Sequence, residues 1–187
     1  MKKLLQIIRP EILSILSEKQ KRAIQVIDDE DFSQVKKKLV EEFKKQNFFP
    51  DDEYLENGFL ALKQYYAVAV IDQLNMHAVS DKVDPFWHMH ILFTEQYYNL
   101  SMNTLGFYMH HDPLDHDNTD KVDFIVKLYD YTNEVYDKMF SWKDENFYPE
   151  QMPRASMVCY HYTGDSSDRC EHIFPIKAEF EDFYKKF

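Results

Sequence analysis

Apolar residues recur at intervals of three and four along most of the chain, the spacing that places them on one face of an α-helix. This pattern predicts one or two helices over residues 2–27, with Pro10 at a break or at an early helical position. Further helices are expected over about 32–43, 52–74, 85–105 and 120–140, and a last one follows Pro175. The hydrophobic pattern therefore predicts a mainly α protein.

The helix expected over 85–105 has the clearest ends. Asp84 is a candidate N-cap, and Pro85 follows it at a position where the missing backbone N–H has no cost. Gly106 stands where a residue with left-handed backbone would end the helix. Apolar side chains cover most of its circumference, so we expect this helix to be central.

The pattern becomes irregular after Trp142. Residues 158–162 alternate between apolar and polar positions, as a short strand would. No repeat or long linker divides the 187 residues, a length that suits one domain. The predicted fold is one domain over 1–187, a multi-helix bundle with a short irregular or β-containing C-terminal segment.

The charge and composition argue against several classes of partner. A formal net charge of -11 repels phosphate backbones, so we expect no nucleic-acid binding. No apolar stretch is long enough for a signal peptide or a membrane span, and no glycine-rich loop suggests a nucleotide cofactor. The two cysteines are too few for a disulfide framework. We therefore expect a cytoplasmic protein.

Six of the eight histidines lie within one forty-residue stretch: His77, His88, His90, His110, His111 and His116. His88 lies one helical turn after Asp84, a spacing at which the carboxylate can orient the imidazole. His90 falls about 200° away from His88 on the same helix, so the two rings cannot converge on one ion while the helix is regular. His77 and His116 are expected at the surface.

Five residues are candidate ligands of a divalent metal: His88 with Asp84, or His90 with groups of the following loop such as His110 and His111. Neutral imidazoles and carboxylates suit zinc, iron or manganese. In the alternative interpretation, Asp84 caps the helix, each histidine forms a local hydrogen bond, and the His110–Asn118 loop is a solvated connector. The sequence leaves both interpretations open.

A second, weaker metal site is suggested near the C-terminus by Cys159, His161, Cys170 and His172. If residues 158–162 form a strand, Cys159 and His161 project from the same face, as one ion would require. The spacing is not a common zinc-finger pattern, and free cysteines are usually small buried hydrophobic residues. Both interpretations stay open.

One segment resembles a known family. Ser80, Val83, Asp84, Trp87 and His88 follow the order Ser-x-x-Val-Asp-x-x-Trp-His, with Gly106 and His110-His111-Asp112-Pro113 after them. This order resembles the signature of the glycine-rich-domain-containing protein family over about residues 54–113. The resemblance implies a helical domain, and it marks Asp84, Trp87, His88, Gly106, His111 and Pro113 as motif positions. Ser101 stands where that pattern usually has a cysteine, the glycine-rich tail is absent, and no settled reaction is implied.

Two functions follow from these observations. The first is a divalent-metal-binding helical domain; whether it is also a metal-dependent enzyme depends on open coordination positions that a sequence does not show. The alternative is a non-catalytic interaction module whose acidic, tyrosine-rich surface binds a basic protein partner, because opposite charges steer association and tyrosines are enriched at interfaces.

Overall fold

The computed structural model of the chain describes residues 3–162. Helices make up 62% of the structure and a small three-stranded sheet accompanies them, which confirms the predicted mainly α fold. The helices are α1 (Leu4–Ile7), α2 (Pro10–Ile15), α3 (Glu18–Asp29), α4 (Ser33–Lys45), α5 (Asp52–Ile71), α6 (Asp84–Leu92), α7 (Thr94–Thr104) and α8 (Thr119–Met139), with a short 3-10 helix over Arg154–Ser156. The strands are β1 (His77–Val79), β2 (His110–Pro113) and β3 (Cys159–Tyr162).

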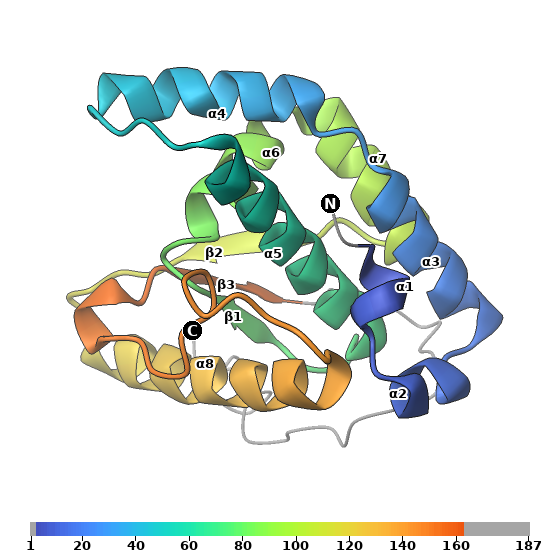
Figure 1. Cartoon of the computed structure of the whole chain (residues 1–187). Coiled ribbons are helices and arrows are strands. Elements are labelled where there is room, and N and C mark those ends of the chain that lie inside the picture. The colour runs from blue at the N-terminus through green and yellow to red at the C-terminus, as the bar shows by residue number, and fades with distance from the viewer. Residues whose placement is uncertain (1–2, 163–187) are drawn as a thin grey trace.

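Helix α5 runs through the middle of the molecule, with α4 and α8 at opposite ends of the view in Figure 1. Almost all of its residues after Tyr54 are buried, because α3, α6, α8 and β1 contact it from different directions. Gly58 lies where the helix meets Phe86 of α6, and a Cβ at this position would come within 2.1 Å of the Phe86 ring. Only glycine allows the two helices to approach this closely.

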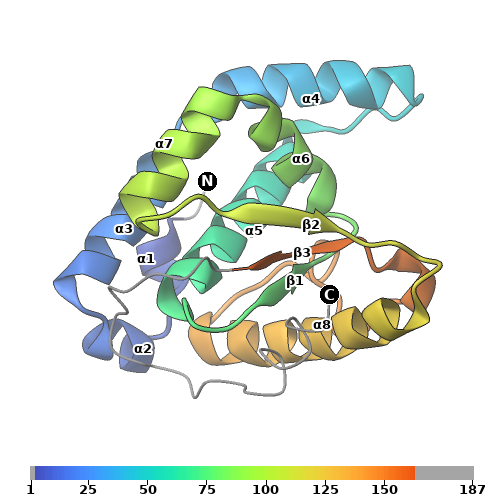
Figure 2. The same ribbon diagram turned by 180° about the vertical axis from the view of Figure 1, so that it is seen from behind.

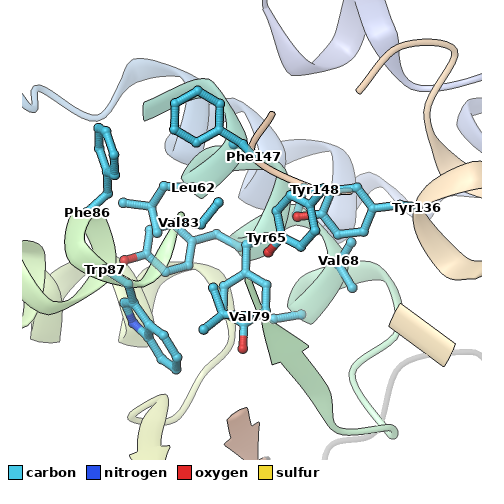
Figure 3. Close-up of a cluster of buried hydrophobic side chains, with 14 of the residues drawn as sticks. Leu62, Tyr65, Val68, Val79, Val83, Phe86, Trp87, Tyr136, Phe147 and Tyr148 are labelled. Carbon is cyan, nitrogen blue, oxygen red and sulfur yellow. The ribbon is translucent and has the colours of Figure 1, made fainter. Parts of the chain in front are cut away.

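Aromatic side chains fill the space around α5. Figure 3 shows Tyr65, Trp87, Tyr136, Phe147 and Tyr148 in one buried cluster, drawn from elements that are far apart in the sequence. Trp87 is fully buried, and its indole N–H donates to the Tyr97 hydroxyl at 3.1 Å. The Tyr97 hydroxyl in turn donates to the Met109 carbonyl at 2.6 Å, so this chain of hydrogen bonds ties α6 and α7 to the segment that enters β2.

The strands are arranged in the order β1-β3-β2, and both pairs are antiparallel. Figure 2 shows β2 nearest to α6 and α7, while β1 lies nearest to α8. His77, His161 and His111 occupy neighbouring register positions across the three strands. The predicted strand over 158–162 is confirmed as β3, whereas the segment from His110, predicted as a loop, begins with β2.

The helix predicted over 85–105 is two helices, which is a correction. The backbone leaves helical geometry at Phe93, with φ -86° and ψ 65°, and α7 begins at the next residue. The sequence around Phe93 does not predict this break, because it contains neither Pro nor Gly. The reason is tertiary: α6 packs on α4 whereas α7 packs on α3, and one straight helix would not serve both contacts. Gly106 does have the expected left-handed backbone, with φ 84°.

The other helices follow the predicted stripes with small shifts of their ends. The segment over 2–27 is an exception and a correction: it forms three helices rather than the one or two predicted, and Pro10 begins the second of them. No helix in the described part of the chain is long and apolar enough to cross a membrane. The helix predicted after Pro175 lies outside the described residues.

Candidate metal centre

Four side chains with metal-binding atoms meet between the start of α6 and the sheet. Asp84 and His88 come from α6, His111 from β2 and Cys159 from β3. One ligand atom from each of Asp84, His111 and Cys159 lies within 4.8 Å of the other two. The site thus joins residues that the sequence assigned to two separate candidate sites.

The carboxylate of Asp84 is at the centre of this group. Oδ1 lies 2.9 Å from Cys159 Sγ and 3.6 Å from His111 Nε2, and Oδ2 lies 3.3 Å from His88 Nδ1. Asp84 is the first residue of α6 rather than its N-cap, which is Val83, and no side-chain cap bond is formed there. The carboxylate therefore points into the group of donor atoms instead of capping the helix.

The Nε2 atoms of the two imidazoles of the site, those of His88 and His111, point toward each other. His88 Nε2 lies 2.7 Å from His111 Nε2. Two lone pairs at this distance repel, so one ring must carry a proton on Nε2 and donate it, or a cation must lie where both lone pairs are directed. Burial lowers the pKa of His88; Asp84 opposes this shift and His111 adds to it. His88 is accordingly held toward the neutral form, the form that binds metals.

Cys159 reaches the site because β3 is the central strand. Its register partner on β2 is Pro113, two residues beyond His111, and its side chain is buried against Asp84. Burial raises the pKa of the Cys159 thiol, and the neighbouring Asp84 carboxylate raises it further. Without a cation the thiol stays protonated and donates to Asp84. A bound divalent ion would reverse this, because a coordinating thiol is deprotonated.

The donor set and its spacing fit a divalent ion. Ligand atoms about 2.0–2.3 Å from a tetrahedral ion are roughly 3.3–3.7 Å apart. The 3.6 Å between Asp84 Oδ1 and His111 Nε2 matches this spacing, whereas the 2.9 Å between Asp84 Oδ1 and Cys159 Sγ would have to lengthen by about half an ångström. One carboxylate, one thiolate and one or two imidazoles are a set that zinc accepts. His88 is about half-exposed, so its ring has room to move the few tenths of an ångström that a shared ion requires.

His90 and His110 do not join this group. The His90 ring is buried on the other side of α6, where Nδ1 lies 2.8 Å from the Tyr66 hydroxyl and Phe32 packs on its face. Burial lowers the pKa of His90 to about 3, so the ring is neutral. His110 precedes His111 on a strand and projects to the opposite side, where its ring packs against Tyr108. The five candidate ligands therefore reduce to Asp84, His88 and His111, with Cys159 added.

The second predicted site is only partly described. Cys159 and His161 do project from one face of β3, but His161 Nδ1 lies 2.9 Å from the Tyr65 hydroxyl rather than in the group around Asp84. Its pKa is well below the ordinary value because the ring is buried and His77 is close. Cys170 and His172 lie outside the described residues, so the four-residue site stays a prediction.

His77 was expected at the surface and is fully buried, which is a correction. Its Nε2 lies 3.1 Å from Asp72 Oδ2, and its ring stacks on Tyr131. The three residues of β1 are all buried, so they lack the alternation by which a strand is recognised in a sequence. His116 is exposed, as predicted.

The ring of Trp87 packs against one of the candidate ligands and helps to hold it in place. It packs edge-on against His111, with the centroids 4.7 Å apart, and its N–H is held by Tyr97. Ser80 donates to the Phe147 carbonyl and accepts from the Val83 backbone N–H, which fixes the turn before α6. Several residues of the motif in the sequence thus either belong to the site or position its ligands.

Comparison with known proteins gives a family and no reaction. A family model described as UCP032817-like matches residues 20–124, more than half of the chain, including Asp84, His88 and His111 but not Cys159. No curated protein matches the chain significantly. The same holds for solved structures.

Proposed function

The chain belongs to the UCP032817-like family, and we propose that it is a divalent-metal-binding domain whose ion is held by Asp84, His111 and Cys159, with His88 beside them. The observation that carries this proposal is the convergence of three different ligand atoms, from α6, β2 and β3, within 4.8 Å. Exposed carboxylates often cluster without a cation, but here Asp84 and Cys159 are buried. Without an ion the two groups hydrogen-bond to each other, and a divalent ion bound between them would replace that hydrogen bond with coordination to both.

The arrangement favours zinc, because thiolate and imidazole are ligands of a soft to borderline ion. Three protein ligands with a fourth position at the surface are typical of catalytic zinc sites, whereas four protein ligands are typical of structural ones. The exposed His88 decides between these cases. If it stays free of the ion, its imidazole could act as a general acid or base beside the Lewis acid that a zinc ion would supply, as a metal-dependent enzyme requires.

The resemblance to the glycine-rich-domain-containing family belongs to this proposal as well. Asp84, His88 and His111, which that resemblance marks, are the residues that supply carboxylate and imidazole to the site. We infer that Asp-x-x-Trp-His followed by His-His-x-Pro is a metal-binding motif. In it the tryptophan, Trp87, packs against His111, the second residue of the His-His pair.

Equilibrium dialysis against Zn²⁺ tests the proposal. The full chain should bind about one ion, and His111→Ala should lower the affinity by more than about 100-fold. His110→Ala is the matched control, because His110 is the neighbouring, exposed imidazole on the same strand, and it should bind as the wild type does. Equal affinities for the two variants would refute the proposed site.

The alternative function, an interaction module with a tyrosine-rich surface, is less well supported because many of the tyrosines are buried. Eight tyrosines are buried in the described part of the chain: Tyr65, Tyr66, Tyr97, Tyr129, Tyr131, Tyr136, Tyr148 and Tyr160. These side chains stabilise the core and are not available to a partner. The expectation of a tyrosine-rich exterior is therefore wrong for these residues, and a basic protein partner stays a prediction that rests on the net charge alone.

A further inference from the structure

An open depression of about 490 Å³ lies directly beside the candidate metal centre. It is lined by His88, Ile91, Leu92, Tyr108, His110 and His111. Two of these residues belong to the metal centre, whereas the buried ligands Asp84 and Cys159 lie behind them. A coordination position that the protein leaves free would therefore face this depression, whose volume is in the range of small-molecule sites.

Among the described residues, the polar groups that line the depression are three imidazoles and one phenol, with no carboxylate. This is notable in a chain with a net charge of -11, and another depression in the described part of the chain is lined by Asp51, Glu53 and Asp144. Imidazole N–H and phenol O–H groups donate hydrogen bonds to oxygen. These lining residues therefore contribute hydrogen-bond donors, and no negative charge of their own that would repel an anionic group at the ion.

The rest of the lining is apolar and partly aromatic. Ile91 and Leu92 supply the aliphatic part of it, and Leu92 is 71% exposed. Tyr108 is held edge-on between the rings of Tyr97, at 5.4 Å, and His110, at 5.2 Å. Apolar side chains beside a polar site mark a surface for the apolar part of a ligand, and a fixed aromatic edge favours a flat ring.

We propose that this depression binds an aromatic carboxylate, with its carboxylate oxygen at the free coordination position and its ring on Leu92 and Tyr108. This inference rests on the proposed metal site and names the class of ligand that the site takes. The ring would pack between Ile91 and Leu92 of α6 and Tyr108, which precedes β2.

The test uses the full chain loaded with Co²⁺, whose visible absorption reports changes at the ion. Benzoate, acetate and benzylamine are titrated separately. Benzoate should alter the cobalt spectrum and bind about tenfold more tightly than acetate, the gain expected from burying roughly 60 Å² of ring surface. Benzylamine, which has the ring but a positive charge, should leave the spectrum unchanged.

Leu92→Asp places a carboxylate in the depression without touching the ligands. It should weaken benzoate binding about tenfold, through the lost apolar contact and the added negative charge, weaken acetate binding less, and leave the cobalt affinity unchanged. Phe49→Asp is the control, because Phe49 is also 71% exposed but lies outside the residues that line the depression.

Each result has one meaning. Equal binding of benzoate and acetate, benzoate binding without a change in the cobalt spectrum, or an unaffected Leu92→Asp variant would overturn the ligand proposal while the metal site stands. Failure of the wild type to take up cobalt, measured before any ligand is added, would overturn the metal site and this inference together.

Discussion

Cys159 Sγ lies 2.9 Å from Asp84 Oδ1, although the two residues are 75 positions apart in the chain. The contact joins the start of α6 to the central strand of the sheet. Both side chains offer ligand atoms for a divalent ion, and His111 completes a group of three such atoms within 4.8 Å of one another. The relationship between these two residues is therefore the basis of the metal-site proposal.

The first prediction concerns Asp84→Asn and the stabilisation that metal provides. An ion that binds only the folded chain adds about 2.7 kcal/mol to the free energy of unfolding when its free concentration is 100 times Kd. Thermal or urea unfolding with and without Zn²⁺ should show this gain for the wild type and no gain for Asp84→Asn at the same Zn²⁺ concentration. A full gain in the variant would contradict the central position of this carboxylate.

His88→Ala distinguishes a catalytic site from a structural one. Because His88 is half-exposed and lies beside the group of Asp84, His111 and Cys159 rather than in it, we expect its removal to weaken Zn²⁺ binding only about tenfold. Competition with a chromophoric chelator would measure this loss. A loss as large as that of His111→Ala would mean that His88 is a full ligand and that the ion has no free position.

Gly58→Ala tests the close approach between α5 and α6. The added Cβ would overlap the Phe86 ring, which cannot yield because it packs against Phe59 and Phe147. We expect a loss of about 1–3 kcal/mol in the free energy of unfolding, despite the better helix propensity of alanine. Chemical denaturation measures it, with the exposed Glu56→Ala on the same helix as control. A stabilised Gly58→Ala protein would show that the interhelical contact is looser than the structure indicates.

Asp72 provides a pH-dependent prediction away from the metal centre. Burial acts to raise its pKa, but hydrogen bonds from His77, Tyr131 and Asn75 outweigh it, so the pKa lies below the ordinary value. The carboxylate therefore stabilises the fold at pH values above about 4, and this contribution is lost as the pH falls through the lowered pKa. Asp72→Asn should cost about 1.5–3 kcal/mol at pH 7.

The difference between Asp72→Asn and the wild type should shrink in acid. Urea unfolding at pH 7 and near pH 3 would measure it, and Asp130→Asn on the exposed side of α8 serves as control. A difference that is the same at both pH values would show that the charge of Asp72 contributes nothing, and that only its shape matters.

Local patterns accounted for most helices but not for the arrangement of the site. The stripes over 52–74 and 120–140 correspond to α5 and α8, and Gly106 ends α7 as its position suggested. The break at Phe93 was missed because it depends on which helices α6 and α7 contact. β2 was missed because its four residues pair only with a strand nearly fifty positions later.

The site shows the same limit. Asp84 and His88 could be identified from one helical turn, and His111 from the clustering of histidines. Cys159 was assigned to a different site, since only the antiparallel pairing of β2 with β3 brings it beside Asp84. Helical geometry alone predicted that His88 and His90 lie on different sides of their helix. That His110 and His111 project in opposite directions could be predicted only by knowing that they lie on a strand.

The most direct test of the metal centre is the absorption spectrum of the Co²⁺-loaded chain. Coordination by Cys159 predicts an intense near-ultraviolet thiolate-to-cobalt charge-transfer band at one equivalent of cobalt, which Cys159→Ser removes while the weaker visible bands persist. A wild-type spectrum without that band, or a band that survives in Cys159→Ser, would contradict the assignment of this thiol to the ion.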